Sequence, residues 1–214
     1  MNIGRGRPRG GRTDAKERLL AEARRQFVDR GYTRTTLRGV AGACGVDVAL
    51  IGYHFGSKRG LFAAAMEVPV GPADVVAAAT RNGTVDAELL LAGLIRVWED
   101  PTTGPPLRSL ALAALADNAE REVVREYLEQ EVVGALSSRL AGPNRERRAR
   151  AAAYVLTGAV LSHYVLRLNA GSEPETLFAD LIGPLAAALH PPARWEGGDH
   201  GSRARPARRP ADES

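Results

Sequence analysis

The chain has 214 residues, of which 44% are hydrophobic and 25% are charged, a balance typical of a globular protein with a buried core. The net charge of +4 is uneven: residues 1–60 carry 13 Lys and Arg against 5 Asp and Glu, whereas residues 61–190 carry 11 against 16. The single cysteine, Cys44, excludes internal disulfides and suits a reducing cytoplasm. The basic N-terminal part indicates a phosphate-facing surface.

Residues 1–12 show no apolar periodicity, and we expect them to form a disordered basic arm. Arg5, Arg7 and Arg9 are separated by Gly and Pro, and segment 5–8 resembles an AT-hook, an arginine arm that lies in narrow minor grooves of DNA. The alternative is a solubilising tail without a defined contact. A secretory signal is not expected, because no apolar stretch follows the basic start.

A first helix is expected at 13–30, and three short helices follow it. Thr36, Asp47 and Ser57 each suit the N-cap of one of these helices, because a side-chain oxygen there accepts a hydrogen bond from a free backbone N–H. Gly45 suits the left-handed residue that ends a helix. Two helices joined by a tight glycine turn form a helix-turn-helix, whose second helix enters the major groove of DNA.

Residues 35–62 follow the pattern TT-x(3)-VA-x-x-CGV-x(4)-I-x-x-HF-x-SK-x-x-LF. This pattern resembles the N-terminal domain of the TetR family of bacterial transcriptional repressors, with no gap in the spacing from Thr36 to Phe62. The resemblance is dense over 13–62 and thinner to about residue 189. It implies a regulator that binds a palindromic DNA operator as a homodimer and responds to a small ligand.

The resemblance implies that the recognition helix, 47–55, contacts bases or phosphates. It carries these contacts onto Val48, Ala49, Leu50, Tyr53 and His54. Apolar side chains there suit thymine methyl groups, and Tyr53 and His54 suit phosphates. Gly52 departs from the family, which often has a large aromatic residue at this position, so a base contact is not expected there.

Three further residues of the helix-turn-helix are candidates for contact with DNA. Arg38, in the first turn of the helix before the glycine turn, matches a family position that reaches a base; contact with guanine and contact with phosphate remain equally open. Thr36 and Lys58 stand at the starts of two helices, where free backbone N–H groups and the helix dipole attract phosphate.

From residue 61 to 190 the sequence predicts helices separated by Pro and Gly, and no segment alternates like a strand, so we predict an all-α fold. The expected helices are 72–80, 84–99, 107–116, 119–140, 145–169 and 175–189. The sequence VPVGP at 68–72 predicts an interruption where the family has a longer fourth helix. We divide the chain into the arm 1–12, a DNA-binding domain 13–60, a regulatory and dimerisation domain 61–190, and a disordered tail 191–214.

The resemblance implies a ligand pocket inside the regulatory domain. Large or polar residues among its Ala- and Leu-rich helices are the candidates for the lining: Leu94, Trp98, Leu110, Tyr127, Tyr154 and His163. Such a lining predicts a small, mostly apolar effector. The alternative for each of these residues is ordinary packing in the core.

Two surfaces of the regulatory domain have distinct patterns. Helix 145–169 is apolar nearly all round from residue 151 to residue 166, and helix 175–189 has a wide apolar stripe. In the family the last two helices pair with their copies in a four-helix bundle; the alternative is an intramolecular core. The glutamates of 120–131 alternate with arginines and predict a solvated helix face, with pairs such as Arg125–Glu129.

Other classes of protein remain as alternatives. A small α-helical enzyme is disfavoured because the four histidines lack metal-ligand spacing, and because neither a nucleophile elbow nor a phosphate-binding glycine loop occurs. No cofactor or metal is therefore expected. A nonspecific, nucleoid-type DNA binder, an activator and a regulator without a ligand stay open. We expect a cytoplasmic protein without a membrane span, because the most apolar run, 151–168, contains polar residues.

Overall fold

The computed structural model describes residues 11–168 and 173–190. Its regular structure is helical apart from two strands of two residues, which confirms the all-α class. In chain order the elements are α1 (Gly11–Arg30), α2 (Leu37–Cys44), α3 (Val48–Phe55), α4 (Lys58–Ala65), α5 (Pro72–Ala78), β1 (Thr80–Arg81), β2 (Thr84–Val85), α6 (Ala87–Glu99), α7 (Gly104–Ala116), α8 (Asn118–Leu128), the π-helical turn η1 (Glu129–Gly134), α9 (Ala135–Ser137), α10 (Arg145–Ala159), the π-helical turn η2 (Val160–Val165) and α11 (Pro174–Leu189). In the described part of the chain no helix is long and apolar enough to cross a membrane.

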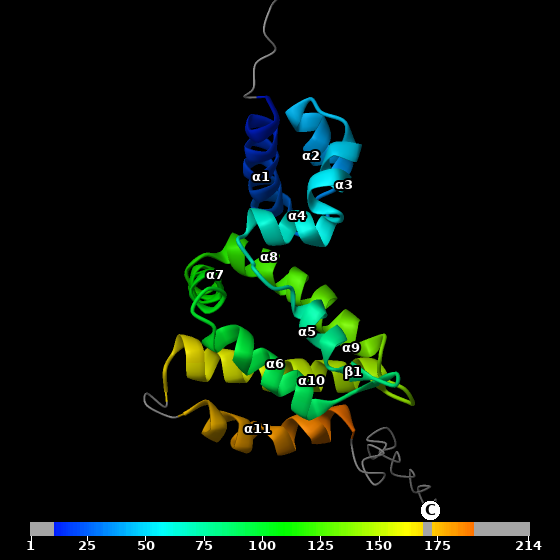
Figure 1. Cartoon of the computed structure of the whole chain (residues 1–214), viewed down its shortest axis with the longest axis vertical. Helices are drawn as coiled ribbons and strands as arrows, with labels where there is room; N and C mark the ends of the chain where they lie inside the picture. The colour runs from blue at the N-terminus through cyan, green and yellow to red at the C-terminus, as the bar shows by residue number, and fades with distance from the viewer. Residues whose placement is uncertain (1–10, 169–172, 191–214) are drawn as a thin grey trace, which may run out of the picture.

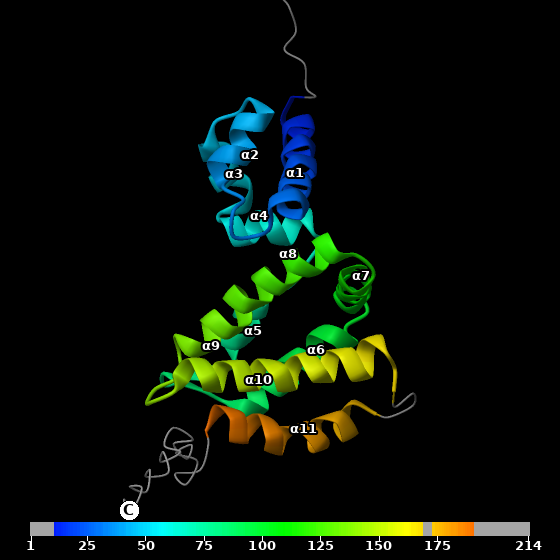
Figure 2. The same ribbon diagram turned by 180° about the vertical axis from the view of Figure 1, so that it is seen from behind.

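Helices α1 to α4, which we call the α1–α4 unit, lie together at one end of the molecule (Figure 1; Figure 2 gives the opposite view). α1 packs against α2 and α4, and α3 packs against the same two helices. Leu19, Ala23 and Phe27 recur every four residues and turn one apolar face of α1 inward. Ile51 of α3 and Phe62 of α4 are fully buried against this face.

Side-chain caps set the starts of three helices in the α1–α4 unit. Thr36 Oγ1 accepts a hydrogen bond from the N–H of Gly39, Asp47 Oδ1 accepts one from Ala49, and Ser57 Oγ accepts one from Gly60. Each N-cap residue has an extended backbone, as a cap requires. Gly45 has φ 65° and ends α2 in the left-handed conformation. The predicted helix-turn-helix is therefore confirmed.

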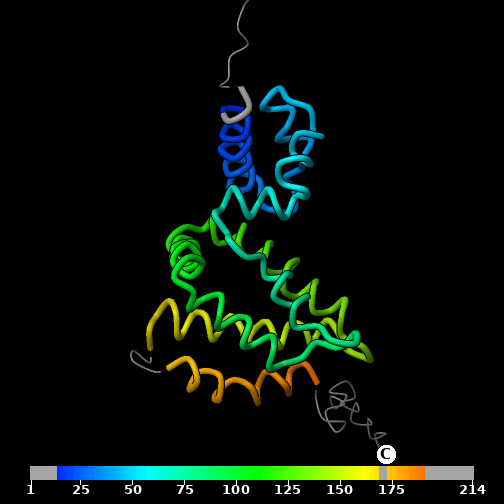
Figure 3. Tube along the Cα trace, viewed as in Figure 1, coloured from blue at the N-terminus to red at the C-terminus, as the bar shows by residue number. Residues whose placement is uncertain are grey.

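The connection between α4 and α5 is not helical. α4 ends at Ala65, Glu67 takes a positive φ of 57°, and α5 begins only at Pro72. Figure 3 traces this connection as it leaves the α1–α4 unit. The interruption predicted from the prolines is confirmed. α4 packs against α1 and α3, so the α1–α4 unit runs to Ala65, whereas the DNA-binding domain predicted from the sequence ends at residue 60.

A hairpin of two short strands, β1 and β2, stands where the sequence predicted the end of one helix at 80 and the start of the next at 84. Thr80 pairs with Val85 and Arg81 with Thr84 in an antiparallel ladder. Asn82 and Gly83 both have positive φ, 50° and 76°, which is the turn that Asn-Gly favours between strands. The prediction of helix up to Thr80 and from Thr84 was wrong because the turn chemistry of Asn-Gly overrides the flanking helical pattern.

The other end of the molecule is built on α6, α10 and α11 (Figures 1 and 2). α11 packs against both α6 and α10. Leu91, Leu136, Ala152, Leu185 and Leu189 are buried in the shared core. The long helices expected over 119–140 and 145–169 each pass into a π-helical turn, at Glu129 and Val160. A π turn inserts one extra residue into the helix, and helix propensity gives no sign of it.

Candidate functional site

The outer face of α3 is the surface expected to meet DNA. Val48, Ala49, Gly52 and Tyr53 are exposed on it, and Tyr53 is 79% exposed. His54 is half-buried, with its ring centroid 5.1 Å from that of Tyr53. The methyl groups on this exposed face can contact thymine methyl groups, and the phenol O–H can donate a hydrogen bond to a phosphate oxygen.

Leu50 is less available than the sequence predicted. It is half-buried and packs against the core of the α1–α4 unit. The next residue, Ile51, is fully buried, and one residue advances an α-helix by only about 100°. Leu50 therefore lies on the flank of α3, where only part of its side chain remains exposed.

Arg38 is exposed on α2 and makes no hydrogen bond or ion pair with any described residue. The other arginines of the α1–α4 unit differ. Arg25 pairs with Glu22 and Asp29 on α1, and Arg59 pairs with Asp74. The guanidinium of Arg38 is thus available for a base or a phosphate, as its five N–H donors allow.

Thr36 and Lys58 are already engaged within the protein. The Thr36 hydroxyl oxygen caps α2. Lys58 Nζ donates to the backbone oxygen of Thr33 at 3.0 Å and lies 4.7 Å from the ring centroid of Tyr32. Partial burial lowers the pKa of Lys58. An ammonium group has three donors, so two remain for a phosphate.

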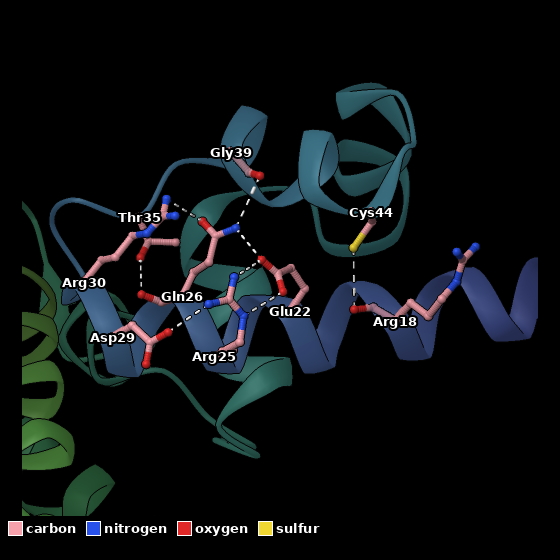
Figure 4. Close-up of polar contacts among 9 residues, drawn as sticks. All are labelled: Arg18, Glu22, Arg25, Gln26, Asp29, Arg30, Thr35, Gly39 and Cys44. Atoms are coloured by element: carbon pink, nitrogen blue, oxygen red, sulfur yellow. Dashed lines mark hydrogen bonds and ion pairs between the residues drawn. The ribbon is translucent and has the colours of Figure 1, made fainter.

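A buried glutamine fixes α1 against the helix-turn-helix (Figure 4). Gln26 is 1% exposed, and its side-chain amide donates to Glu22 Oε1 at 2.7 Å and to the backbone oxygen of Gly39 at 3.3 Å. Thr35 Oγ1 donates to the backbone oxygen of Gln26 at 2.9 Å. Gln26 was not predicted as a structural residue from the sequence. Its position three residues after Ala23 was a usable signal, because residues three apart lie on the same face of a helix.

Glu22 is the charged centre of this network. Hydrogen bonds from Arg25 and then from Gln26 lower the pKa of Glu22 from 4.5 to about 2. Its carboxylate is therefore ionised throughout the physiological range, and it holds Arg25 on the surface of α1 by the two bonds drawn in Figure 4.

An apolar cavity of about 300 Å³ lies among α5, α6, α7, α8 and the α10–η2 region. No charged side chain lines it, and Trp98, Tyr127 and Thr157 carry its only side-chain polar atoms. The apolar residues of the lining come from every one of these elements, among them Val76, Leu90, Ala111, Ala114, Val124, Val132 and Val160. Such a site suits an uncharged, hydrophobic molecule.

Four of the six expected pocket residues, Leu94, Trp98, Leu110 and Tyr127, line this cavity. Tyr154 and His163 do not. Tyr154 is 75% exposed on α10, and half-buried His163 packs with its ring 4.8 Å from that of Tyr164. Both were chosen for size and polarity, and these properties do not say which side of a helix faces inward.

The glutamates expected to form a solvated face of α8 are divided. Arg125 pairs with Glu122 rather than with Glu129, which pairs with Arg150. Glu126 and Glu131 instead face the α1–α4 unit, and the prediction of a solvated face was wrong for both.

Glu126 accepts a hydrogen bond from the backbone N–H of Thr33 at 2.6 Å. The side chain of Glu131 is 12% exposed and lies 3.6 Å from the guanidinium of Arg59, and desolvation raises the pKa of Glu131. Within the run of alternating charges, no feature of the sequence separates these two carboxylates from their neighbours.

Three predicted contacts, Arg5, Arg7 and Arg9, lie outside the described residues, as does the segment 191–214. Among the residues that are described, no group of three or more His, Cys, Asp and Glu side chains could hold a metal ion.

Residues 19–65 match the family described as bacterial regulatory proteins, tetR family. Residues 87–193, half of the chain, match the Tetracyclin repressor-like C-terminal domain. The chain belongs to the TetR family. It is accordingly a DNA-binding transcription regulator whose α2–α3 pair is the TetR helix-turn-helix.

The chain also resembles individual proteins, at 26–36% identity for the three that follow. The HTH-type transcriptional repressor AcnR of Corynebacterium glutamicum is 36% identical over 90 residues, which are 42% of this chain and 43% of that repressor. Among solved structures, the multidrug binding protein EbrR complexed with imidazole is 27% identical, with a TM-score of 0.47 over 90% of this chain and 100% of that one. A TetR-family regulator from Streptomyces coelicolor A3 is 26% identical, with a TM-score of 0.44 over 86% and 99%.

Proposed function

We propose that this TetR-family regulator is a ligand-responsive repressor that binds a palindromic operator as a homodimer. The observation that carries the proposal is the exposed face of α3, with Tyr53 79% exposed, beside an arginine on α2 that no described residue engages. Exposed tyrosine side chains and unpaired guanidinium groups are both common contacts at a DNA interface.

The residues would divide between reading and positioning. Val48, Ala49 and the outer part of Leu50 would contact base edges in the major groove, and Arg38 would reach a base or the adjacent phosphate. Tyr53 and His54 would donate to phosphates. Thr36 and Lys58, at the starts of α2 and α4, would lie beside the backbone, and Arg5, Arg7 and Arg9 would add contacts in the minor groove.

A dimer would form through the outer faces of α10 and α11. Tyr154 is exposed on α10, and a Cβ at Gly158 or Gly183 would have no atom within 4 Å. Small residues let two copies approach closely, and the exposed apolar side chains would be buried. Two-fold symmetry would then set two copies of α3 about one helical turn of DNA apart, or a multiple of that.

The apolar cavity would hold the effector. Because no charged side chain lines it, the effector would be uncharged and hydrophobic, with Trp98, Tyr127 or Thr157 as its hydrogen-bonding partners. Release of DNA would require different affinities of the effector for the two conformers, worth about 1–3 kcal/mol. A regulator acting on DNA in a bacterium would work in the cytoplasm.

Selection of genomic fragments by the full-length protein at near-physiological salt, followed by sequencing, tests the proposal. We expect a shared inverted repeat, whose position also points to the regulated genes. Recovery of AT-rich fragments without a shared site would overturn it in favour of a nonspecific binder. The salt dependence of binding to a recovered fragment and to unrelated DNA then separates base reading from phosphate contact.

A further inference from the structure

One stretch of helix, from Val124 to Val132, has two different neighbours on its two faces. On one face Val124, Tyr127, Leu128 and Val132 line the apolar cavity. On the other face Glu126, Gln130 and Glu131 contact the α1–α4 unit. The stretch includes the start of the π-helical turn η1, at Glu129. We call it the coupling segment.

Glu126 holds the loop between α1 and α2. Its carboxylate accepts a hydrogen bond from the backbone N–H of Thr33, with 2.6 Å between nitrogen and oxygen. Gln130, one turn later, donates from its side-chain amide to Thr33 Oγ1 at 3.2 Å. Gly31 has φ +86°, and a Cβ built there would lie 2.9 Å from the Glu126 carboxylate. Only glycine combines that backbone conformation with room for the carboxylate.

The loop held in this way leads directly into the helix-turn-helix. Thr35 Oγ1 donates to the backbone oxygens of Gln26 and Gly31, each at 2.9 Å, and Thr36 caps α2. Lys58, at the start of α4, donates to the backbone oxygen of Thr33. A displacement of Thr33 therefore acts on the starts of both α2 and α4.

Tyr127 brings the cavity wall into the core of the α1–α4 unit. Its ring stacks on Phe62 with centroids 4.2 Å apart and meets the edge of Tyr32 at 5.4 Å. Tyr127 is 2% exposed, and its ring lies between the cavity and the rings of Phe62 and Tyr32. Closely packed interiors transmit displacement rather than absorb it, and a molecule that presses on Tyr127 therefore shifts the coupling segment relative to Phe62.

We infer that Glu126 is the positioning residue through which occupation of the cavity reaches the α1–α2 loop. The inference rests on the proposed function, which gives the cavity a ligand and α3 a DNA site. A molecule in the cavity displaces the coupling segment relative to the α1–α4 unit. The bond from the Thr33 N–H to the Glu126 carboxylate lengthens, and the loop that precedes the Thr36 cap loosens.

Hydrogen exchange of the full-length protein tests this inference without DNA and without an effector. Ala111→Phe places a ring in the cavity from α7 and leaves the coupling segment unaltered. Exchange of segment 31–36 is followed by mass spectrometry in the parent, Ala111→Phe, Glu126→Ala and the double variant. Ala114→Leu fills the same cavity and replaces Ala111→Phe if that variant does not fold.

Filling the cavity should speed exchange in 31–36 by about tenfold, because one charge-assisted hydrogen bond is weakened. Glu126→Ala alone should speed it to a similar extent, and filling the cavity should then add nothing. Glu122→Ala is the matched control, since that carboxylate, one turn earlier on α8, pairs with Arg125 at the surface. In that background filling should act as in the parent.

Two results would overturn the inference. One is unchanged exchange in 31–36 when the cavity of the parent is filled. The other is an equal increase on filling with and without Glu126, which would make Glu126 a merely structural contact. Both are distinct from a failure of operator binding, because no DNA is present and the fragment selection tests that step separately.

Discussion

Arg38, which is exposed, and Lys58, which is half-buried, show at the residue scale how two cations of one unit differ in what they can do. Arg38 makes no hydrogen bond or ion pair with a described residue, so its guanidinium donors are available to DNA. Lys58 already donates to Thr33 and covers the ring of Tyr32. Arg38 is therefore suited to reading a base, whereas Lys58 can bind a phosphate while it also stabilises the fold.

Lys58→Ala should weaken binding to all DNA sequences alike and make the slope of log K against log salt shallower by about 1, because one phosphate contact is lost. The measurement is a salt titration of binding to operator and unrelated duplexes. Lys16→Ala, an exposed lysine on α1, is the control. An unchanged slope together with reduced stability would leave Lys58 with only its contacts to Thr33 and Tyr32.

Glu22 predicts a specific dependence of stability on pH. Its pKa is about 2 in the folded protein against an ordinary 4.5, so it stabilises the fold above about pH 4.5 and that contribution is lost as the pH falls towards 2. Because its partner Arg25 is 54% exposed, we expect about 1–2 kcal/mol rather than the full shift.

The Glu22→Gln variant should therefore have a lower free energy of unfolding than the parent at neutral pH, by the amount given above. Its free energy of unfolding should also fall less steeply than that of the parent between pH 4.5 and 2. Urea unfolding at several pH values measures both, with exposed Glu17→Gln as the control. Parallel curves for Glu22→Gln and the parent would contradict the assignment of the stabilisation to this carboxylate.

At the scale of elements, what the sequence predicts is local. Thr36, Asp47, Ser57 and Gly45 determine helix ends through their own neighbours, so the helix-turn-helix could be predicted to within a residue or two. The position of Glu126 depends on Thr33, which lies 93 residues earlier in the chain, and no local pattern reports such a contact.

The cavity shows the same limit. Leu94, Trp98, Leu110 and Tyr127 were predicted from size and type, but Tyr154, chosen by the same criteria, faces solvent. From Ala151 onward α10 is apolar nearly all round, so its pattern does not distinguish the inner face from the outer one. The valines of the cavity wall carry no signal beyond ordinary core composition.

Gly60→Ala tests the close packing of α3 against α4. A Cβ at Gly60 would lie 2.0 Å from the backbone oxygen of Phe55, so the two helices would have to separate, and we expect a loss of about 2 kcal/mol or more. Gly42→Ala in α2, where no atom lies within 4 Å, should instead gain about 0.5–1 kcal/mol. Urea unfolding of both variants gives the comparison, and equal effects would contradict it.

At the scale of the whole molecule, the DNA-binding face and the proposed dimer face lie at opposite ends (Figure 1), and the cavity lies among the elements between them. An effector in that position can act on the α1–α4 unit only through the elements it touches. Two sets of elements meet that condition: the non-helical connection after α4, whose Val68 and Val70 line the cavity, and α8 with η1, which contact both the cavity and the α1–α4 unit.

Tyr154→Arg should break the proposed dimer, because it places a charge in the centre of a surface that two copies would bury. We expect at least about a tenfold weaker dimer in sedimentation equilibrium, with weaker operator binding in step. Leu112→Arg is the matched control, since Leu112 is 54% exposed on α7, away from α10 and α11. Equal masses for Tyr154→Arg, Leu112→Arg and the parent would place the dimer interface elsewhere.

The central claim is that α2 and α3 read a DNA sequence, and its most direct test is competition at about 150 mM salt between the selected operator duplex and a scrambled duplex of the same composition. Specific recognition predicts a preference for the operator of at least about 1,000-fold. Arg38→Ala should reduce that preference at one base pair in each half-site if the guanidinium reads a base. A preference near one for the parent protein would contradict the claim and leave a binder that recognises only the phosphate backbone.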